Sequence, residues 1–265
     1  MSSIRPAAVA DMFYPGNPTQ LRTEIQSMLA AASATGAAPK AIIVPHAGYI
    51  YSGPIAASAY TQLIPARNKI HRVVLLGPCH RVPLSGLATS SADFFETPLG
   101  TIPIDRELCD QILKFPQVEE FDLTHAQEHS LEVQLPFLQQ VLDKFTLLPL
   151  VVGDASGTEV HEVLEAVWGG DETLIVISSD LSHYHDYRTA QTMDSATCKA
   201  IEHLDGGHIH YDQACGRNPV LGLLLSARKH HLKVSTLDLR NSGDTAGSKD
   251  QVVGYGAWAF LQPAE

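Results

Sequence analysis

The chain has 265 residues, of which 45% are apolar, and its formal net charge is −11. This length and apolar share can supply the core of one large α/β domain, and we expect residues 1–265 to form a single domain because no repeat or long linker divides them. The acidic balance, without a Lys/Arg cluster, argues against a nucleic-acid binder. No apolar run reaches the roughly 18 residues of a membrane helix and no secretory signal is visible, so we expect a cytoplasmic protein without membrane contact.

The hydrophobic pattern predicts alternating helices and strands. In chain order, helices are expected over 18–32, 54–64, 105–115, 130–143, 158–168, 189–204 and 219–231, and strands over 41–45, 73–77, 146–153, 173–180, 233–240 and 252–261. Asn17 before Pro18 and Asn218 before Pro219 are typical of helix N-caps followed by proline at the first helical position. Pro136 removes one helical hydrogen bond from the segment 130–143 and predicts a kink there.

This alternation predicts an α/β fold with a mostly parallel or mixed central sheet and helices on both faces. Strand pairing near 233–261 is expected to be antiparallel in part. In sheets of this kind, ligands bind outside the carboxyl ends of the strands. Side chains that directly follow the strands are therefore the first candidates for a functional site.

His46, His80 and Asp180 each follow the carboxyl end of a different predicted strand, in the stretches PHAGY, GPCHR and SSDLSH. In a parallel arrangement these three ends lie on one rim of the sheet. Neutral imidazole is a good ligand for iron, copper and zinc. Each histidine alone fits a structural role about equally well, and their common placement favours metal ligation.

Cys215 lies in ACGRNP, just before a predicted helix whose N-terminal N–H groups would favour a thiolate. A small buried apolar thiol is the other interpretation of this residue. Cys79 adjoins His80, and in an extended chain the two side chains point in opposite directions, so we do not expect them to bind the same ion. A Cys–His hydrolase centred on Cys215 has no local sequence signature.

Asp180 and His183 are three residues apart, which places them on one face if the segment forms a helical turn. The pair could relay protons, or the carboxylate could orient the imidazole. Alternatively, Asp180 or Ser182 caps the next helix. His129, in EHSLE, is a weaker candidate for a site residue.

Taken together, several stretches of the chain resemble the Memo family. They occur in the family's order and cover nearly the whole chain: RPAAVADMFYP, PHAGYIYSG, LGPCHRVPLSG, FETPLGTIPID, EHSLEVQLPFLQ, SSDLSHY, CGRNP and VVGYGAW. The resemblance implies a fold like the catalytic subunit of class III extradiol dioxygenases, which use non-haem iron(II) bound by two His and one Glu. It implies His46 and His80 as imidazole ligands, Cys215 in place of the carboxylate, and Asp180 and His183 as further pocket residues.

The resemblance also implies oxygen-linked redox chemistry on iron(II), with copper as the alternative because a thiolate is a softer ligand. The substrate would be a small molecule, for example a phenol. A different interpretation is a non-catalytic binding or adaptor module that holds a peptide or small molecule in a relic pocket, since animal members are linked to signalling partners. Bacterial relatives suggest a radical-enzyme partner, and the sequence leaves a homo-oligomer open. Cys79, Arg81 and Asn218 depart from the animal pattern.

Overall fold

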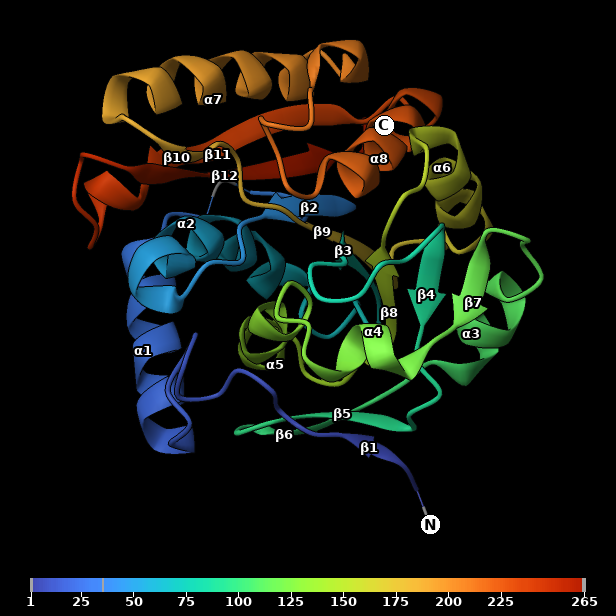
Figure 1. Cartoon of the computed structure of the whole chain (residues 1–265). Helices are drawn as coiled ribbons and strands as arrows, with labels where there is room; N and C mark the ends of the chain where they lie inside the picture. Colours follow the sequence, from blue (N-terminus) through green and yellow to red (C-terminus); the bar gives the residue numbers. More distant parts are fainter. Residues whose placement is uncertain (1, 35, 264–265) are drawn as a thin grey trace.

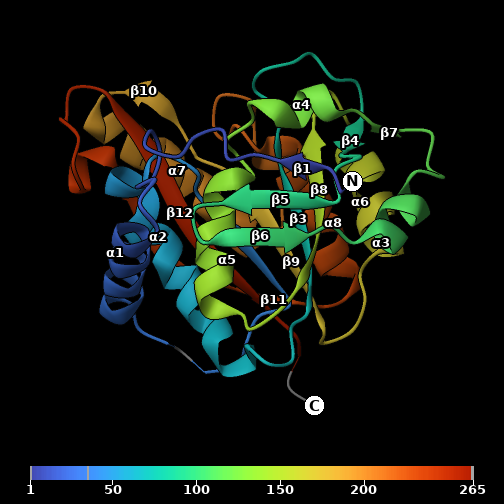
Figure 2. The same cartoon turned by 90° about the horizontal axis from the view of Figure 1, so that it is seen from below.

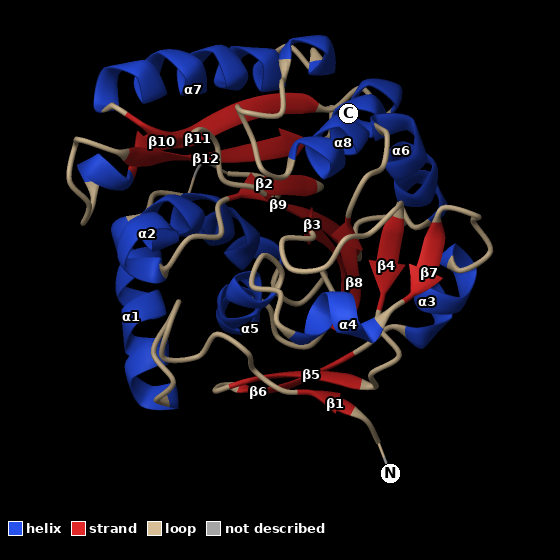
Figure 3. Ribbon diagram, viewed as in Figure 1, coloured by secondary structure: helices blue, strands red, loops and turns tan. Residues whose placement is uncertain are grey.

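The structure is a computed structural model that describes residues 2–34 and 36–263. Within these residues the main sheet has nine strands in the order β10-β12-β2-β9-β3-β8-β4-β7, with β11 also paired to β12 (Figures 1 and 3). Its strands are β2 Ala41–Val44, β3 Arg72–Pro78, β4 Leu87–Thr89, β7 Val118–Glu120, β8 Thr146–Val152, β9 Thr173–Ser178, β10 His183–His185, β11 Lys233–Asn241 and β12 Val252–Leu261. The predicted α/β fold with a mixed central sheet is confirmed.

Helices cover both faces of this sheet. The helices are α1 Pro18–Ala31, α2 Tyr49–Tyr60, α3 Arg106–Ile112, α4 Asp122–Ala126, α5 Leu135–Val141, α6 Gly157–Ala166, α7 Tyr187–Glu202 and α8 Arg217–Lys229. Helices α1, α2 and α5 pack together on one face, and α3, α6, α7 and α8 lie on the other (Figure 1). None of the helices among the described residues combines the length and apolar character that crossing a bilayer requires.

A second, smaller sheet lies beside the main one. It consists of β1 Ile4–Arg5, β5 Phe94–Thr97 and β6 Gly100–Pro103, and Figure 2 shows it passing in front of α5. The sequence pattern did not predict these strands, because each is only two to four residues long and carries little periodicity.

The four central strands β2, β9, β3 and β8 run parallel to one another. Their residues are almost completely buried, which is why they read as continuous apolar runs without polar alternation. Strand β12 pairs antiparallel with both β2 and β11, so the expected antiparallel pairing near 233–261 is confirmed. The carboxyl ends of the parallel strands therefore meet at one rim.

Most predicted helices differ from the observed ones by a few residues at their ends, and for α2, α5 and α8 the difference has an identifiable physical reason. Helix α2 begins at Tyr49 and accommodates Pro54 internally, and a 3₁₀ turn, Thr61–Ala66, continues it. The segment predicted as one helix over 130–143 is a 3₁₀ turn, Glu132–Gln134, followed by α5, in whose first turn Pro136 costs no hydrogen bond. The predicted cap at Asn218 is wrong: α8 begins at Arg217 after Gly216, and the Asn218 side chain donates to the Gly153 carbonyl.

A buried ammonium group holds the connection between α6 and β9. The Lys40 side chain precedes β2, and its Nζ lies 2.6, 3.3, 2.7 and 2.8 Å from the carbonyl oxygens of Trp168, Gly169, Gly170 and Thr173. Burial lowers the pKa of Lys40 to about 8. A carbonyl group cannot pair with another carbonyl, so the cation gives these four neighbouring acceptors a shared donor; the Gly170 carbonyl also accepts from the Thr173 amide at 3.2 Å.

We predict that Lys40→Met lowers the free energy of unfolding by about 1–3 kcal/mol, because the side chain keeps its length while the four carbonyls lose the donor that they share. Urea denaturation followed by circular dichroism measures the change. Lys69→Met, which removes an exposed lysine, is the control and should change stability by less than about 0.5 kcal/mol. Equal stability of the two variants would contradict the assigned role.

Candidate functional site

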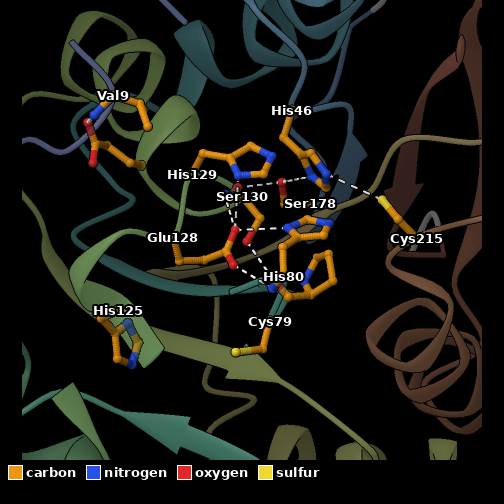
Figure 4. A network of polar contacts seen from close by, with 12 residues as sticks. Val9, His46, Cys79, His80, His125, Glu128, His129, Ser130, Ser178 and Cys215 are labelled. Carbon is orange, nitrogen blue, oxygen red and sulfur yellow. Dashed lines mark hydrogen bonds and ion pairs between the residues drawn. The ribbon is translucent and has the colours of Figure 1, made fainter. Parts of the chain in front are cut away.

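Three side chains from separate parts of the chain meet at the carboxyl rim of the parallel strands. His46 follows β2, His80 follows β3, and Cys215 lies in the turn before α8. One nitrogen of each imidazole and the Cys215 sulfur all lie within 4.8 Å of one another. Figure 4 shows the two rings and the thiol converging, while the Cys79 sulfur is turned away toward the Val82 carbonyl, 3.1 Å distant.

Short backbone contacts fix this convergence. The His46 amide donates to Asp180 Oδ1 at 2.7 Å, which joins the ends of β2 and β9. The Gly216 amide donates to Ser179 Oγ at 2.9 Å, and a Cβ at position 216 would lie 2.6 Å from the Ser179 Cβ. Only glycine allows the turn to approach β9 so closely, and this approach brings Cys215 to the rim.

The hydrogen bonds around Ser178 determine which nitrogen of His46 carries the proton and which carries the lone pair. The Ser178 hydroxyl donates its only proton to the Ser130 carbonyl at 2.6 Å and accepts from Gln134 Nε2 at 2.8 Å. It must therefore also accept from His46 Nδ1, which is 2.9 Å away and carries the proton. The lone pair of neutral His46 is consequently on Nε2, which lies 3.3 Å from Cys215 Sγ.

Glu128 fixes the second imidazole in the same way. Its carboxylate is buried and accepts from the His80 amide at 2.6 Å, from His80 Nδ1 at 2.9 Å and from the Ser130 amide at 2.9 Å. A carboxylate can only accept, so His80 Nδ1 carries a proton, and in the neutral ring Nε2 is left with the lone pair. Such a carboxylate–histidine pair commonly orients a metal ligand.

The ionisation of the buried groups agrees with these assignments. Burial, followed by the neighbouring His80, lowers the pKa of His46 to about 3, so the ring is neutral at pH 7. Burial by itself would raise the pKa of Glu128, but the hydrogen bonds and charge of His80 outweigh it and hold the pKa at about 2. Burial and the nearby Asp180 raise the pKa of Cys215, so without a cation this group is a thiol.

Two groups of side chains are compact enough to hold an ion, and the orientation of their imidazole rings shows which group is suited to it. The His46 and His80 rings are nearly perpendicular, with an interplanar angle of 75° and centroids 5.3 Å apart, so their planes intersect near both rings. The His80 and His129 rings are stacked at 20° and 4.7 Å, although they form a second compact group with Glu128. Nitrogen lone pairs lie in the ring plane, so stacked rings cannot both direct them at one ion.

His129 is instead a wall of the site. Its ring lies between His80 and Phe13, whose ring centroid is 4.6 Å away. His129 Nδ1 is buried and makes no hydrogen bond with the described residues, although Glu128 Oε1 is 3.3 Å away. Burial, followed by the neighbouring His46, lowers the pKa of His129 to about 4.

The backbone conformation between Asp180 and His183 differs from the predicted helical turn. Residues 180 and 183 do not share a helical turn; the chain leaves β9 and pairs with β12, where His183 is opposite Val253. Asp180 Oδ2 lies 4.0 Å from His46 Nε2, and burial raises the pKa of Asp180. His183 Nδ1 lies 2.8 Å from the Leu181 carbonyl. His183 is also one of the neighbours that lower the pKa of Asp180, against the larger effect of burial.

A buried ion pair positions the loop that carries Glu128 and His129. Arg5 pairs with Glu132 and donates to the carbonyl oxygens of His125 and Glu128. Glu132 also accepts from the amides of Ala8 and Val9 and from the Tyr14 hydroxyl. Sequence reasoning gave these supporting residues no role; their acidic and basic types inside apolar stretches were the only signal.

Comparisons with known proteins agree with this architecture. A family model described as "Memo-like protein" matches residues 5–259. A MEMO1 family protein of Aquifex aeolicus is 37% identical over 270 residues, covering 97% of this chain and 99% of that protein. One from Metallosphaera sedula is 35% identical over 279 residues, with coverage of 97% and 99%.

Among solved structures, the uncharacterized protein JW3007 of Escherichia coli K12 has a similar fold. Its TM-score is 0.50 at 11% sequence identity, over 81% of this chain and 98% of that one. Fold and site thus define an α/β protein with a His/His/Cys group at the carboxyl rim of its sheet. From the family match and the full-length relatives, the chain belongs to the Memo family, as its sequence motifs predicted.

The buried His125 predicts how stability depends on pH. Its Nε2 donates to the Ala88 carbonyl at 3.1 Å, Nδ1 has no partner within the described residues, and burial lowers the pKa to about 4. Unfolded histidine titrates near pH 6.5, so the unfolded state binds the proton first, and stability falls as the pH drops from 6.5 to 4. This group contributes up to about 3 kcal/mol of that loss.

We therefore expect His125→Gln, which keeps a donor for Ala88, to lose less stability than the unmodified protein between pH 6.5 and pH 4. The difference should be the contribution of His125, up to about 3 kcal/mol. Urea denaturation at several pH values in that range provides the measurement. His71→Gln, which removes an exposed histidine, should leave the slope unchanged. Identical slopes for His125→Gln and the unmodified protein would show that His125 does not resist protonation.

Proposed function

We propose that this Memo family protein binds one iron or copper ion through His46, His80 and Cys215 and uses it in oxygen-linked redox chemistry. The observation that carries the proposal is the pair of fixed tautomers. Ser178 and Glu128 hold protons on both Nδ1 atoms, so the lone pair of each neutral ring is on Nε2; that of His46 faces the Cys215 thiol, whose proton a metal ion would replace. The near-perpendicular rings allow both lone pairs to meet at one point.

The donor set favours these metals. Imidazole suits iron and copper, and thiolate adds a soft ligand that stabilises Cu(I) or shifts the potential of iron. We place iron(II) first and copper second. When bound, such an ion would supply a Lewis acid and a redox centre for oxygen or a small, for example phenolic, substrate. Cys215 would have to give up its proton to serve as a ligand.

We assign proton handling to three residues around the group. Asp180 Oδ2 lies 4.0 Å from His46 Nε2 and faces the site, and His183 lies beside Asp180. His129 Nδ1 is a buried nitrogen without a hydrogen bond among the described residues, so it can exchange a proton without breaking one. Asp180, His183 and His129 would thus hold or transfer protons next to a bound substrate.

The competing proposal is a binding module without a metal. The Cys215 thiol already has a partner in His46, so the group is satisfied as it stands. A module of this kind would bind a peptide or small molecule at the same rim. We further propose a cytoplasmic location, and a radical-enzyme partner remains part of the enzymatic proposal.

The decisive prediction concerns metal content. Protein purified without oxygen and reconstituted with Fe(II) should retain about one ion per chain by native mass spectrometry. His46→Ala and His80→Ala should lose it, and Cys215→Ala should lose or loosen it, because each removes one donor. Cys79→Ala is the control, because its sulfur is turned away from the group and metal should remain.

Unchanged metal content in both histidine variants would reject the site. Absence of retained metal from the unmodified protein, after reconstitution with iron or copper, would favour the binding module.

A second prediction concerns Glu128. Glu128→Gln should weaken metal affinity about 10–100-fold, because the amide cannot accept from all three donors that face the carboxylate. Competition with a chelator measures the affinity. Asp105→Asn changes a buried carboxylate at the amino ends of β3 and β8, where it accepts from Arg72 and Thr146, away from the carboxyl rim; it should cost stability but leave affinity within about threefold. Equal losses of affinity in the two variants would indicate general destabilisation of the fold.

A further inference from the structure

A cavity of about 420 Å³ opens beside His80 and Cys215. Its walls come from the segment after β3, the end of β8 and the first turn of α8. Most of the lining is apolar and includes Val82, Pro83, Leu84, Val152 and Pro219. Because an engineered cavity of ~150 Å³ binds benzene, this space has room for a six-membered ring with a short side chain.

Two polar side chains in the wall are already bonded within the protein. The Cys79 thiol donates to the Val82 carbonyl at 3.1 Å. The Asn218 amide donates to the Gly153 carbonyl at 2.9 Å, and its oxygen accepts from Arg217 at 3.3 Å. These groups have little hydrogen-bonding capacity left for a ligand, so they add few polar contacts to the apolar lining.

Asp154 is the exception. Its carboxylate is exposed and has no hydrogen bond or ion pair with the described residues, and the described lining includes no Lys or Arg. The neighbouring cation Arg217 is directed elsewhere: its Nε donates to the Ile209 carbonyl at 2.7 Å and its guanidinium lies 4.5 Å from the Tyr211 ring centroid. The negative charge of Asp154 is therefore available to a ligand.

We propose that this cavity binds a small organic ammonium compound, an alkyl- or arylamine. Its apolar body would pack on Pro83, Leu84 and Pro219, and its ammonium group would pair with the Asp154 carboxylate. The opposite end would reach His80 and Cys215, so this ligand would be the substrate presented to the metal. Only this last step rests on the proposed function; amine binding itself does not require a metal.

Three probes of similar shape test the charge preference: 2-phenylethylamine, 2-phenylethanol and 3-phenylpropionate. Ligand-observed NMR titrations on metal-free protein should show the amine binding most tightly. Asp154→Asn should weaken amine binding by about threefold or more and leave 2-phenylethanol unchanged. Asp250→Asn removes an exposed carboxylate elsewhere and should behave like the unmodified protein. Equal affinity for the propionate, or an unaffected Asp154→Asn variant, would overturn the proposal.

Cobalt(II) separates failure of the cavity from failure of the metal site. In cobalt-loaded protein, the amine should shift the thiolate-to-cobalt absorption band, and Asp154→Asn should need a correspondingly higher amine concentration. Amine binding without a band shift would overturn the placement of this ligand as the substrate. Absence of any cobalt band would reject the metal site, and the titrations on metal-free protein would still decide whether the cavity selects amines.

Discussion

The buried ion pair between Arg5 and Glu132 is the interaction on which the arrangement of the site depends. It joins the N-terminal segment to the loop after α4, and this loop carries both Glu128 and His129. Separating two buried charges would be costly, so the loop has one well-defined position. Glu128 can therefore reach the amide and the ring of His80 together, which turns a partly exposed histidine into an oriented one.

Orientation distinguishes this group from a chance meeting of side chains. Two histidines and a cysteine could lie close together with their protons on the inward nitrogens, and an ion would then find few lone pairs. Here Ser178 orients His46 and Glu128 orients His80, the first as a hydroxyl whose own proton is already donated and the second as an acceptor-only carboxylate. Neither supporting group belongs to the set of three; they set the direction of its lone pairs.

The sequence predicted the parts of the site that depend on strand ends. Buried strands read as apolar runs, and parallel strands end at one rim, so the positions of His46, His80 and Asp180 along the chain were enough to place them together. The supporting contacts could not be predicted in this way, since the role of Ser178 requires knowing that Ser130 and Gln134 fold back onto it. Two local predictions failed because tertiary contacts determine the backbone there. The predicted cap at Asn218 is wrong because Gly216 packs against Ser179 and α8 begins at Arg217. The predicted helical turn after Asp180 is absent because the chain is extended and pairs with β12.

The lysine beneath the α6–β9 connection has a wider consequence. Rings of carbonyl oxygens are what potassium channels offer a dehydrated potassium ion, and four such oxygens surround Lys40 Nζ at 2.6–3.3 Å. A free ion in this position would come and go with the salt composition of the surroundings. A cation attached to the backbone by its own side chain cannot be exchanged, so this turn is held in the same way at low and high concentrations of potassium or sodium.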